Sequence, residues 1–168
     1  MLAPEQEILL VVDHATGLPD VLTRLRRVGL DRVLGYLEGG MPAWTRVGFT
    51  TEHLSLLSAA ELRLRVQSGA PVQVLDVRSR GEFAQAHIDN AVNIPLPELR
   101  ARHRELSQQI PIAIVCNSGH RSSTAASLLK PLGLHTVANL AGGMQGYHAA
   151  GFGPECPVCC VPHGPAVR

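Results

Sequence analysis

The fold is decided by one short stretch of the chain, Ile112-Ala113-Ile114-Val115-Cys116-Asn117-Ser118-Gly119-His120-Arg121-Ser122-Ser123. Its first four residues are apolar and predict a buried strand, and Ser122–Leu129 has the pattern of a helix. A strand that leads through a short loop into a helix is typical of a parallel α/β sheet. Backbone N–H groups and the positive end of the helix dipole converge at such a loop. The sequence therefore predicts an anion-binding loop that starts at Cys116.

The chemistry of this loop is predicted from its cysteine. Convergent N–H groups and a nearby positive charge favour thiolate over thiol, and the thiolate is the nucleophilic form. Arg121 is the one permanently charged side chain of the loop. We therefore interpret Cys116 as a nucleophile rather than a buried structural cysteine. The candidates for substrate binding are Asn117, Ser118, Gly119, His120, Arg121 and Ser122.

Three of these side chains have two interpretations each. Ser122 either donates its hydroxyl to the sulfur or caps the helix that begins there. Arg121 either binds an anionic donor or braces the loop against a carboxylate such as Asp76 or Glu82. His120 either offers a proton near neutral pH or is an ordinary exposed loop histidine.

The residues around the loop predict strands that alternate with helices. Short β-branched runs predict the strands Gln73–Leu75, Ala91–Ile94, Ile112–Val115 and Thr136–Leu140. Two capping boxes predict helix starts at Ser58-x-x-Glu61 and Ser79-x-x-Glu82. This alternation indicates an α/β fold, a doubly wound parallel sheet with helices on both faces. Ligands of such sheets bind at the carboxyl ends of the strands, where Cys116 is predicted to lie.

Four ordered motifs resemble those of the rhodanese family of sulfurtransferases. In chain order they are Val74–Phe83, Ala86–Pro95, the Cys-x-x-Gly-x-Arg loop Cys116–Arg121 and the Gly-Gly turn Leu140–Met144. The resemblance implies a rhodanese-like fold and transfer of sulfane sulfur through a persulfide of Cys116. The implied donors are thiosulfate or a low-molecular-weight persulfide such as glutathione persulfide, and the acceptor is a thiol or cyanide. Asp76 and Arg78 would support the loop through hydrogen bonds, and no cofactor is expected.

Two other function classes remain open. Cys-loop phosphatases and arsenate reductases use a similar cradle, although those that share this fold have a loop one residue longer than Cys116–Arg121. A non-catalytic rhodanese-like interaction module is the second alternative. The presence of the cysteine in an intact loop speaks against it.

An internal repeat indicates how the chain is divided. Residues 29–49 resemble residues 133–152, and Ile8–Val12 corresponds to Ile112–Val115. We predict a truncated, catalytically silent rhodanese-like half unit at 1–50 and a complete rhodanese domain at 52–152. The half unit resembles the silent unit in fusions with a metallo-β-lactamase-type persulfide dioxygenase domain. Because half a doubly wound unit leaves sheet edges uncovered, we expect this half unit to pack on the complete domain, to pair with a second copy in a homodimer or with a missing N-terminal partner domain, or to stay partly disordered.

The remaining residues, 153–168, form a tail rich in Cys and Pro. Cys156, Cys159, Cys160 and His163 could bind a metal ion, accept sulfur from Cys116 or be inert. Proline at three positions of the tail argues against a redox helix. The other histidines lack metal-ligand spacing, so no metal site is expected elsewhere.

Composition excludes several partner classes. The 168 residues carry a formal net charge of +1, which gives no reason to expect nucleic acid or an acidic membrane surface. The longest apolar run, Ile8–Val12, is too short to span a bilayer. Glu5 and Glu7 precede this run where a signal peptide would carry positive charge. The spacing of the four cysteines does not indicate a disulfide framework, so we expect a cytoplasmic protein.

Overall fold

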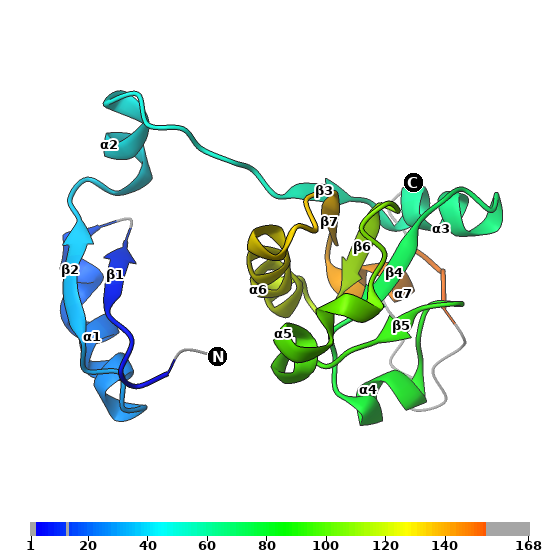
Figure 1. Ribbon diagram of the computed structural model, residues 1–168, viewed down its shortest axis with the longest axis horizontal. Helices are drawn as coiled ribbons and strands as arrows, with labels where there is room; N and C mark the ends of the chain where they lie inside the picture. The colour runs from blue at the N-terminus through cyan, green and yellow to red at the C-terminus, as the bar shows by residue number, and fades with distance from the viewer. Residues whose placement is uncertain (1–2, 13, 154–168) are drawn as a thin grey trace. The chain divides into compact units, whose positions relative to one another are not determined.

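The computed structural model describes residues 3–12 and 14–153, and the chain divides into two units with the boundary in the sequence between His53 and Leu54 (Figure 1). The first unit contains β1 (Ile8–Val11), the 3-10 helix η1 (Ala15–Gly17), α1 (Leu18–Arg27), β2 (Val33–Leu37) and α2 (Gly40–Arg46). Its two strands pair in parallel as a separate small sheet.

The second unit is an alternation of strands and helices. It begins with β3 (Ser55–Leu57), α3 (Ala59–Gln67), β4 (Gln73–Asp76), α4 (Arg80–Gln85) and β5 (Val92–Asn93). Next come η2 (Leu96–Glu98), α5 (Leu99–Arg102), η3 (His103–Glu105) and β6 (Ile112–Val115). The unit ends with α6 (His120–Leu129), η4 (Lys130–Leu132), β7 (Val137–Leu140) and α7 (Gly143–Ala149).

The sheet of the second unit has five parallel strands in the order β3-β7-β6-β4-β5. All four residues of β6 are buried, as expected for a central strand that is covered on both faces. Leu99 of α5 and Leu129 of α6 belong to one hydrophobic cluster, while Leu62 of α3 and Met144 of α7 belong to the other (Figure 1). The predicted fold class, a parallel sheet flanked by helices, is confirmed.

Local signals in the sequence locate several helix starts. The side chains of Ser58 and Ser79 accept hydrogen bonds from the N–H groups of Glu61 and Glu82. The carboxylate of each glutamate in turn accepts the backbone N–H of its serine, so both capping boxes are confirmed. The predicted start of α6 at Ser122 is wrong, because Gly119, with φ 104°, is the N-cap and the helix begins at His120. The edge strand β3 was not predicted, since a three-residue strand is defined only by its pairing with β7.

The first unit repeats the order of elements that surrounds β6 and β7. The strands start in the same register, with Ile8 opposite Val33 and Ile112 opposite Val137. Each copy then enters its last helix through two glycines with the same backbone, φ 71° and 58°. The structure therefore gives both copies the same succession of strand, helix, strand and helix.

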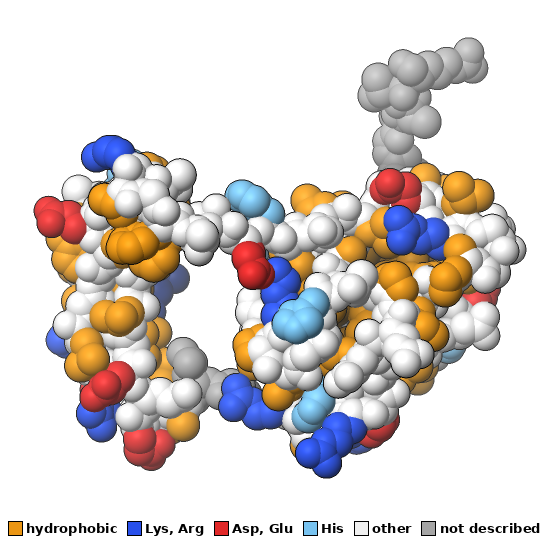
Figure 2. All heavy atoms as spheres, turned by 45° about the horizontal axis from the view of Figure 1, so that its top comes forward, with side chains coloured by type: hydrophobic (Ala, Val, Ile, Leu, Met, Phe, Trp, Pro, Cys, Tyr) orange, Lys and Arg blue, Asp and Glu red, His pale blue; other side chains and the backbone are white. Residues whose placement is uncertain are grey.

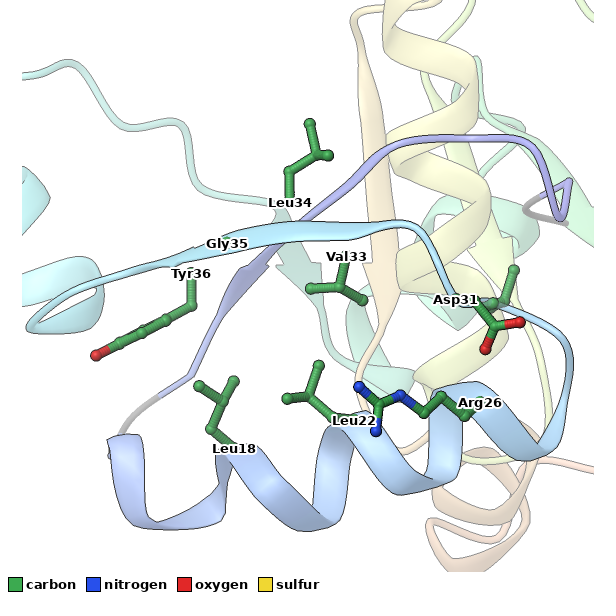
Figure 3. Close-up of a pocket in the computed structure, with 9 residues that line it drawn as sticks. Leu18, Leu22, Arg26, Asp31, Val33, Leu34, Gly35 and Tyr36 are labelled. Atoms are coloured by element: carbon green, nitrogen blue, oxygen red, sulfur yellow. The ribbon is translucent and has the colours of Figure 1, made fainter.

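The two copies differ in how well their apolar side chains are covered. Ala113 and Val115 are each 1% exposed, whereas Leu9 and Val11 at the matching positions of β1 are 75% and 57% exposed. Figure 2 shows apolar side chains on the surface of the first unit among charged ones. In Figure 3, Leu18 and Leu22 of α1 point toward Val33, while Leu34 points away from the helix; all four line a pocket of about 180 Å³.

None of the helices in the described part of the chain has the length and apolar character needed to cross a membrane.

Candidate active site

Cys116 lies directly after the central strand β6, at the carboxyl end of the sheet. The neighbouring strands β4 and β7 place Asp76 and Asn139 at the same end, where parallel strands finish together. Gly119 turns the chain into α6 with a φ of 104°, a conformation that side chains rarely adopt. The loop therefore folds back over the sulfur, and Cys116 is only 1% exposed.

The sulfur of Cys116 lies among hydrogen-bond donors. The N–H of Gly119 donates to Sγ at 3.0 Å, and Oγ of Ser122 lies 3.2 Å from it. Burial raises the pKa of the Cys116 thiol, but bonds from the Ser122 hydroxyl and from the N–H groups of Ser122, Gly119 and Ser118 together lower it by more. The pKa lies below its ordinary value, so the loop favours the nucleophilic thiolate.

Ser122 is a buried residue of the first turn of α6 and not its cap. Its hydroxyl lies 2.6 Å from Oδ1 of Asn139 and 3.0 Å from the carbonyl oxygen of Gly119. The amide Nδ2 of Asn139 donates to the Gly119 carbonyl oxygen at 3.2 Å and to Oγ of Ser123 at 3.1 Å. Sequence reasoning missed Asn139, although one polar residue in the apolar strand Val137–Leu140 is a usable signal.

Arg121 is paired with Glu82 of α4. Its two terminal nitrogens donate to different carboxylate oxygens, Nη1 to Oε2 at 2.9 Å and Nη2 to Oε1 at 2.7 Å. The bonds from Arg121 are the main reason why the pKa of Glu82 is lowered to about 2, and the same pair raises the pKa of Arg121. Of the two interpretations of Arg121, the structure has the brace, with Glu82 rather than Asp76 as partner.

Asp76 and Arg78 form a second ion pair, in which the two side chains are buried at 1% and 6% exposure. Nε of Arg78 donates to both carboxylate oxygens at 3.0 Å, and Nη2 donates to Oδ2 at 2.6 Å and to the carbonyl oxygen of Ala86 at 2.6 Å. The pair ties the end of β4 to the segment after α4. This geometry is that of a supporting pair.

The remaining loop side chains lie on its exposed side. Asn117, Ser118 and His120 are exposed, and Oγ of Ser118 lies 3.1 Å from Nδ1 of His120. The carbonyl oxygen of Asn117 accepts the N–H of Gln145 at 3.1 Å. The main chain of residue 117 is thus held by α7, while these three side chains are exposed to solvent.

No cluster of three His, Cys, Asp or Glu side chains that could hold a metal ion occurs within residues 3–12 and 14–153. The proposed ligands in the tail, Cys156, Cys159, Cys160 and His163, lie outside the described residues. Cys116 is the free cysteine of the described part.

Comparison with known proteins identifies the family of the chain. The sequence pattern of the family described as rhodanese-like domain matches residues 58–150, which is more than half of the chain. The chain belongs to the rhodanese-like family. Its rhodanese domain therefore contains β6, α6 and the Cys116 loop.

Individual relatives cover the rhodanese domain at modest identity. The protein YrkF of Bacillus subtilis (strain 168) is 38% identical over 89 residues, which are 53% of this chain and 48% of YrkF. Thiosulfate sulfurtransferase GlpE of Shewanella oneidensis is 33% identical over 79 residues, 47% of this chain and 78% of GlpE. The chain spans about half the length of the first curated relatives it matches.

A solved structure of a rhodanese-related protein from Thermoplasma volcanium covers 60% of this chain and 95% of its own, with a TM-score of 0.54 and 33% identity. The sheet and its flanking helices are therefore those of the rhodanese-like fold.

Proposed function

We propose that this chain is a sulfurtransferase in which Cys116 carries sulfane sulfur between a donor and an acceptor. The observation that carries the proposal is the sulfur of Cys116, bonded by the N–H of Gly119 and the hydroxyl of Ser122, with a lowered thiol pKa. The names of relatives such as the thiosulfate sulfurtransferase GlpE support the same class of reaction.

The cycle has two transfers. The thiolate of Cys116 attacks the outer sulfur of the donor, the donor's sulfur–sulfur bond breaks, and its inner part leaves with the electron pair. A thiolate acceptor or cyanide then attacks the outer sulfur of the Cys116 persulfide and releases the thiolate. The loop N–H groups are oriented to stabilise negative charge on the transferred sulfur, so the cycle needs no general base when the thiol is already ionised.

The proposed reactants are small molecules. Thiosulfate and glutathione persulfide are the donors, and cyanide, glutathione or a protein thiol are the acceptors. The cycle uses no cofactor, nucleic acid or membrane. We place it in the cytoplasm, where thiol acceptors stay reduced.

The first unit has a separate proposed role. Its exposed Leu9 and Val11 are consistent with a catalytically silent half unit that pairs with a second copy or with another domain.

A steady-state assay tests the proposal. The initial rate of thiocyanate formation is measured over a range of donor concentrations at several fixed cyanide concentrations, for the wild-type chain and for Cys116→Ser. We expect parallel double-reciprocal lines for the wild type, as in ping-pong kinetics, and at least a 100-fold loss in the variant. Thiocyanate formation that survives in Cys116→Ser would reject the mechanism. Hydrolysis of an aryl phosphate or reduction of arsenate without sulfur transfer would favour the phosphatase or reductase class.

A further inference from the structure

The charge of the Cys116 loop is offset by a neighbouring carboxylate. Arg121 is the only permanently charged side chain between Cys116 and Ser122. Both of its terminal nitrogens are bound to Glu82, at 2.9 and 2.7 Å, in the two-pronged geometry of a strong arginine–carboxylate pair. The pKa of Glu82 is lowered to about 2, so this carboxylate stays ionised at neutral pH.

The arginine of the first motif is also neutralised. Arg78 is bound to Asp76 through four hydrogen bonds, three of them to the carboxylate from its side chain and one from its backbone N–H. Arg121, whose pKa is raised chiefly by Glu82, also has charge interactions with Cys116 and Asp76. Arg121 and Arg78 are therefore each paired with a carboxylate, and the loop's remaining attraction for an anion comes from its N–H groups.

The two donor classes bring different charges to this loop. Thiosulfate is a dianion: the Cys116 thiolate takes its outer sulfur, sulfite leaves with the electron pair, and three negative charges are present throughout. A persulfide brings no charge on its sulfur atoms when protonated and one when ionised. In that reaction the thiolate takes the outer sulfur, with its proton if it has one, and the inner sulfur leaves as a thiolate.

We propose that Glu82 is a specificity residue that, by neutralising Arg121, disfavours thiosulfate and favours persulfide donors. The inference rests on the proposed sulfur transfer and adds a donor class to it. A free guanidinium would attract thiosulfate about twice as strongly as a singly charged donor, since the interaction energy scales with charge. Pairing with Glu82 removes most of this advantage.

The substitution Glu82→Gln removes the negative charge of the side chain and keeps its structural role. Gln is accepted at this position of a capping box, so the start of α4 is kept, and its side-chain oxygen still accepts a hydrogen bond from Arg121. The matched control is Glu61→Gln. Glu61 has the same capping-box role with Ser58 at the start of α3, and its neighbouring charge is Arg65 rather than a residue of the loop.

The experiment compares kcat/KM for thiosulfate and for glutathione persulfide in the full chain, with cyanide as acceptor, at about pH 8, where ordinary histidines are neutral. We expect Glu82→Gln to raise kcat/KM for thiosulfate by roughly three- to tenfold and to raise the thiosulfate-to-persulfide ratio by at least about threefold. Glu61→Gln should leave that ratio within about twofold of the wild type.

Two failures are distinguishable. If the wild type uses neither donor, the proposed sulfur transfer fails. If it uses at least one and a folded Glu82→Gln variant leaves the ratio unchanged or lowers it, only the role of Glu82 is overturned.

The salt dependence of the wild type gives a second test that needs no variant. With Arg121 neutralised, kcat/KM for thiosulfate should stay level or rise between about 50 and 300 mM salt, because salt screens repulsion between the dianion and the thiolate. A fall of more than about threefold would reveal an unpaired cation at the loop and would overturn the inference.

Discussion

The main chain of Gly143 lies against that of Cys116. A Cβ at position 143 would overlap the carbonyl oxygen of Cys116 and would come 2.6 Å from that of Asn117. The same approach allows the N–H of Met144 to donate to the Cys116 carbonyl oxygen at 2.8 Å. The Gly-Gly turn after β7 therefore fixes the position of the nucleophile from the side opposite α6.

Gly143→Ala should disrupt the site as well as the fold. The new methyl group would push the Cys116 carbonyl away, and the φ of 58° adds backbone strain, so we expect a loss of roughly 3 kcal/mol or more in the free energy of unfolding. Urea denaturation measures this change. Gly69→Ala is the matched control, because Gly69 has φ 68° and open space where the methyl group would stand, and it should cost only ~1–2 kcal/mol. Equal losses in the two variants would show that the close approach is unimportant.

Ser122→Ala should raise the pKa of the Cys116 thiol. It removes the hydroxyl that lies 3.2 Å from Sγ and lowers the thiol pKa, while the burial that raises this pKa remains. A hydrogen bond to a charged group contributes about 1.5–3 kcal/mol, so the midpoint should rise by roughly one to two pH units. The rate of alkylation by iodoacetamide as a function of pH gives the midpoint.

The control for Ser122→Ala is Ser127→Ala on the exposed side of α6, which should leave the midpoint in place. Since the native thiol pKa is lowered, thiolate formation stabilises the fold above the unfolded-state pKa, and this contribution is lost as pH falls through the native value. An unchanged midpoint in Ser122→Ala would contradict the assigned role of the hydroxyl.

Arg78→Met should lower the free energy of unfolding of the rhodanese domain. The substitution leaves the Asp76 carboxylate buried at 1% exposure without its cation. Breaking one half of a buried pair costs about 3–5 kcal/mol, which thermal or urea unfolding would detect. The double variant Asp76→Asn with Arg78→Met should recover part of this loss, and no recovery would mean that the two side chains are not coupled.

Val12→Cys should not create a second active site. Gly40 approaches the carbonyl oxygen of Val12 as Gly143 approaches that of Cys116, so Val12 stands at the equivalent position of the repeat. Residues 13–17 contain no arginine, and β2 has Tyr36 where β7 has Asn139, since Tyr36 pairs with Leu10 as Asn139 pairs with Ile114. In a Cys116→Ser background we expect no sulfur loading at position 12 by mass spectrometry, and loading there would disprove the silent assignment.

The sequence predicted those parts of the site that are local. Cys116, Gly119 and Arg121 follow from one strand-to-helix loop, and both capping boxes follow from four-residue patterns. The contacts of Asn139 depend on β7 lying beside β6, a neighbour relation that no local pattern specifies.

Other features needed the three-dimensional arrangement for the same reason. The sequence leaves Glu82 and Asp76 as two candidate partners for Arg121, and only the fold selects Glu82, because Asp76 is bound by Arg78. The start of α6 lies at His120, two residues before the predicted Ser122, because the left-handed backbone of Gly119 lets the helix begin directly after it.

The most direct test of a persulfide on Cys116 is the intact mass of the purified chain after incubation with thiosulfate and, separately, with glutathione persulfide. We expect a gain of one sulfur atom, about 32 Da, that disappears on addition of cyanide and is absent from Cys116→Ser. No gain with either donor, or a gain that persists in Cys116→Ser, would contradict the account.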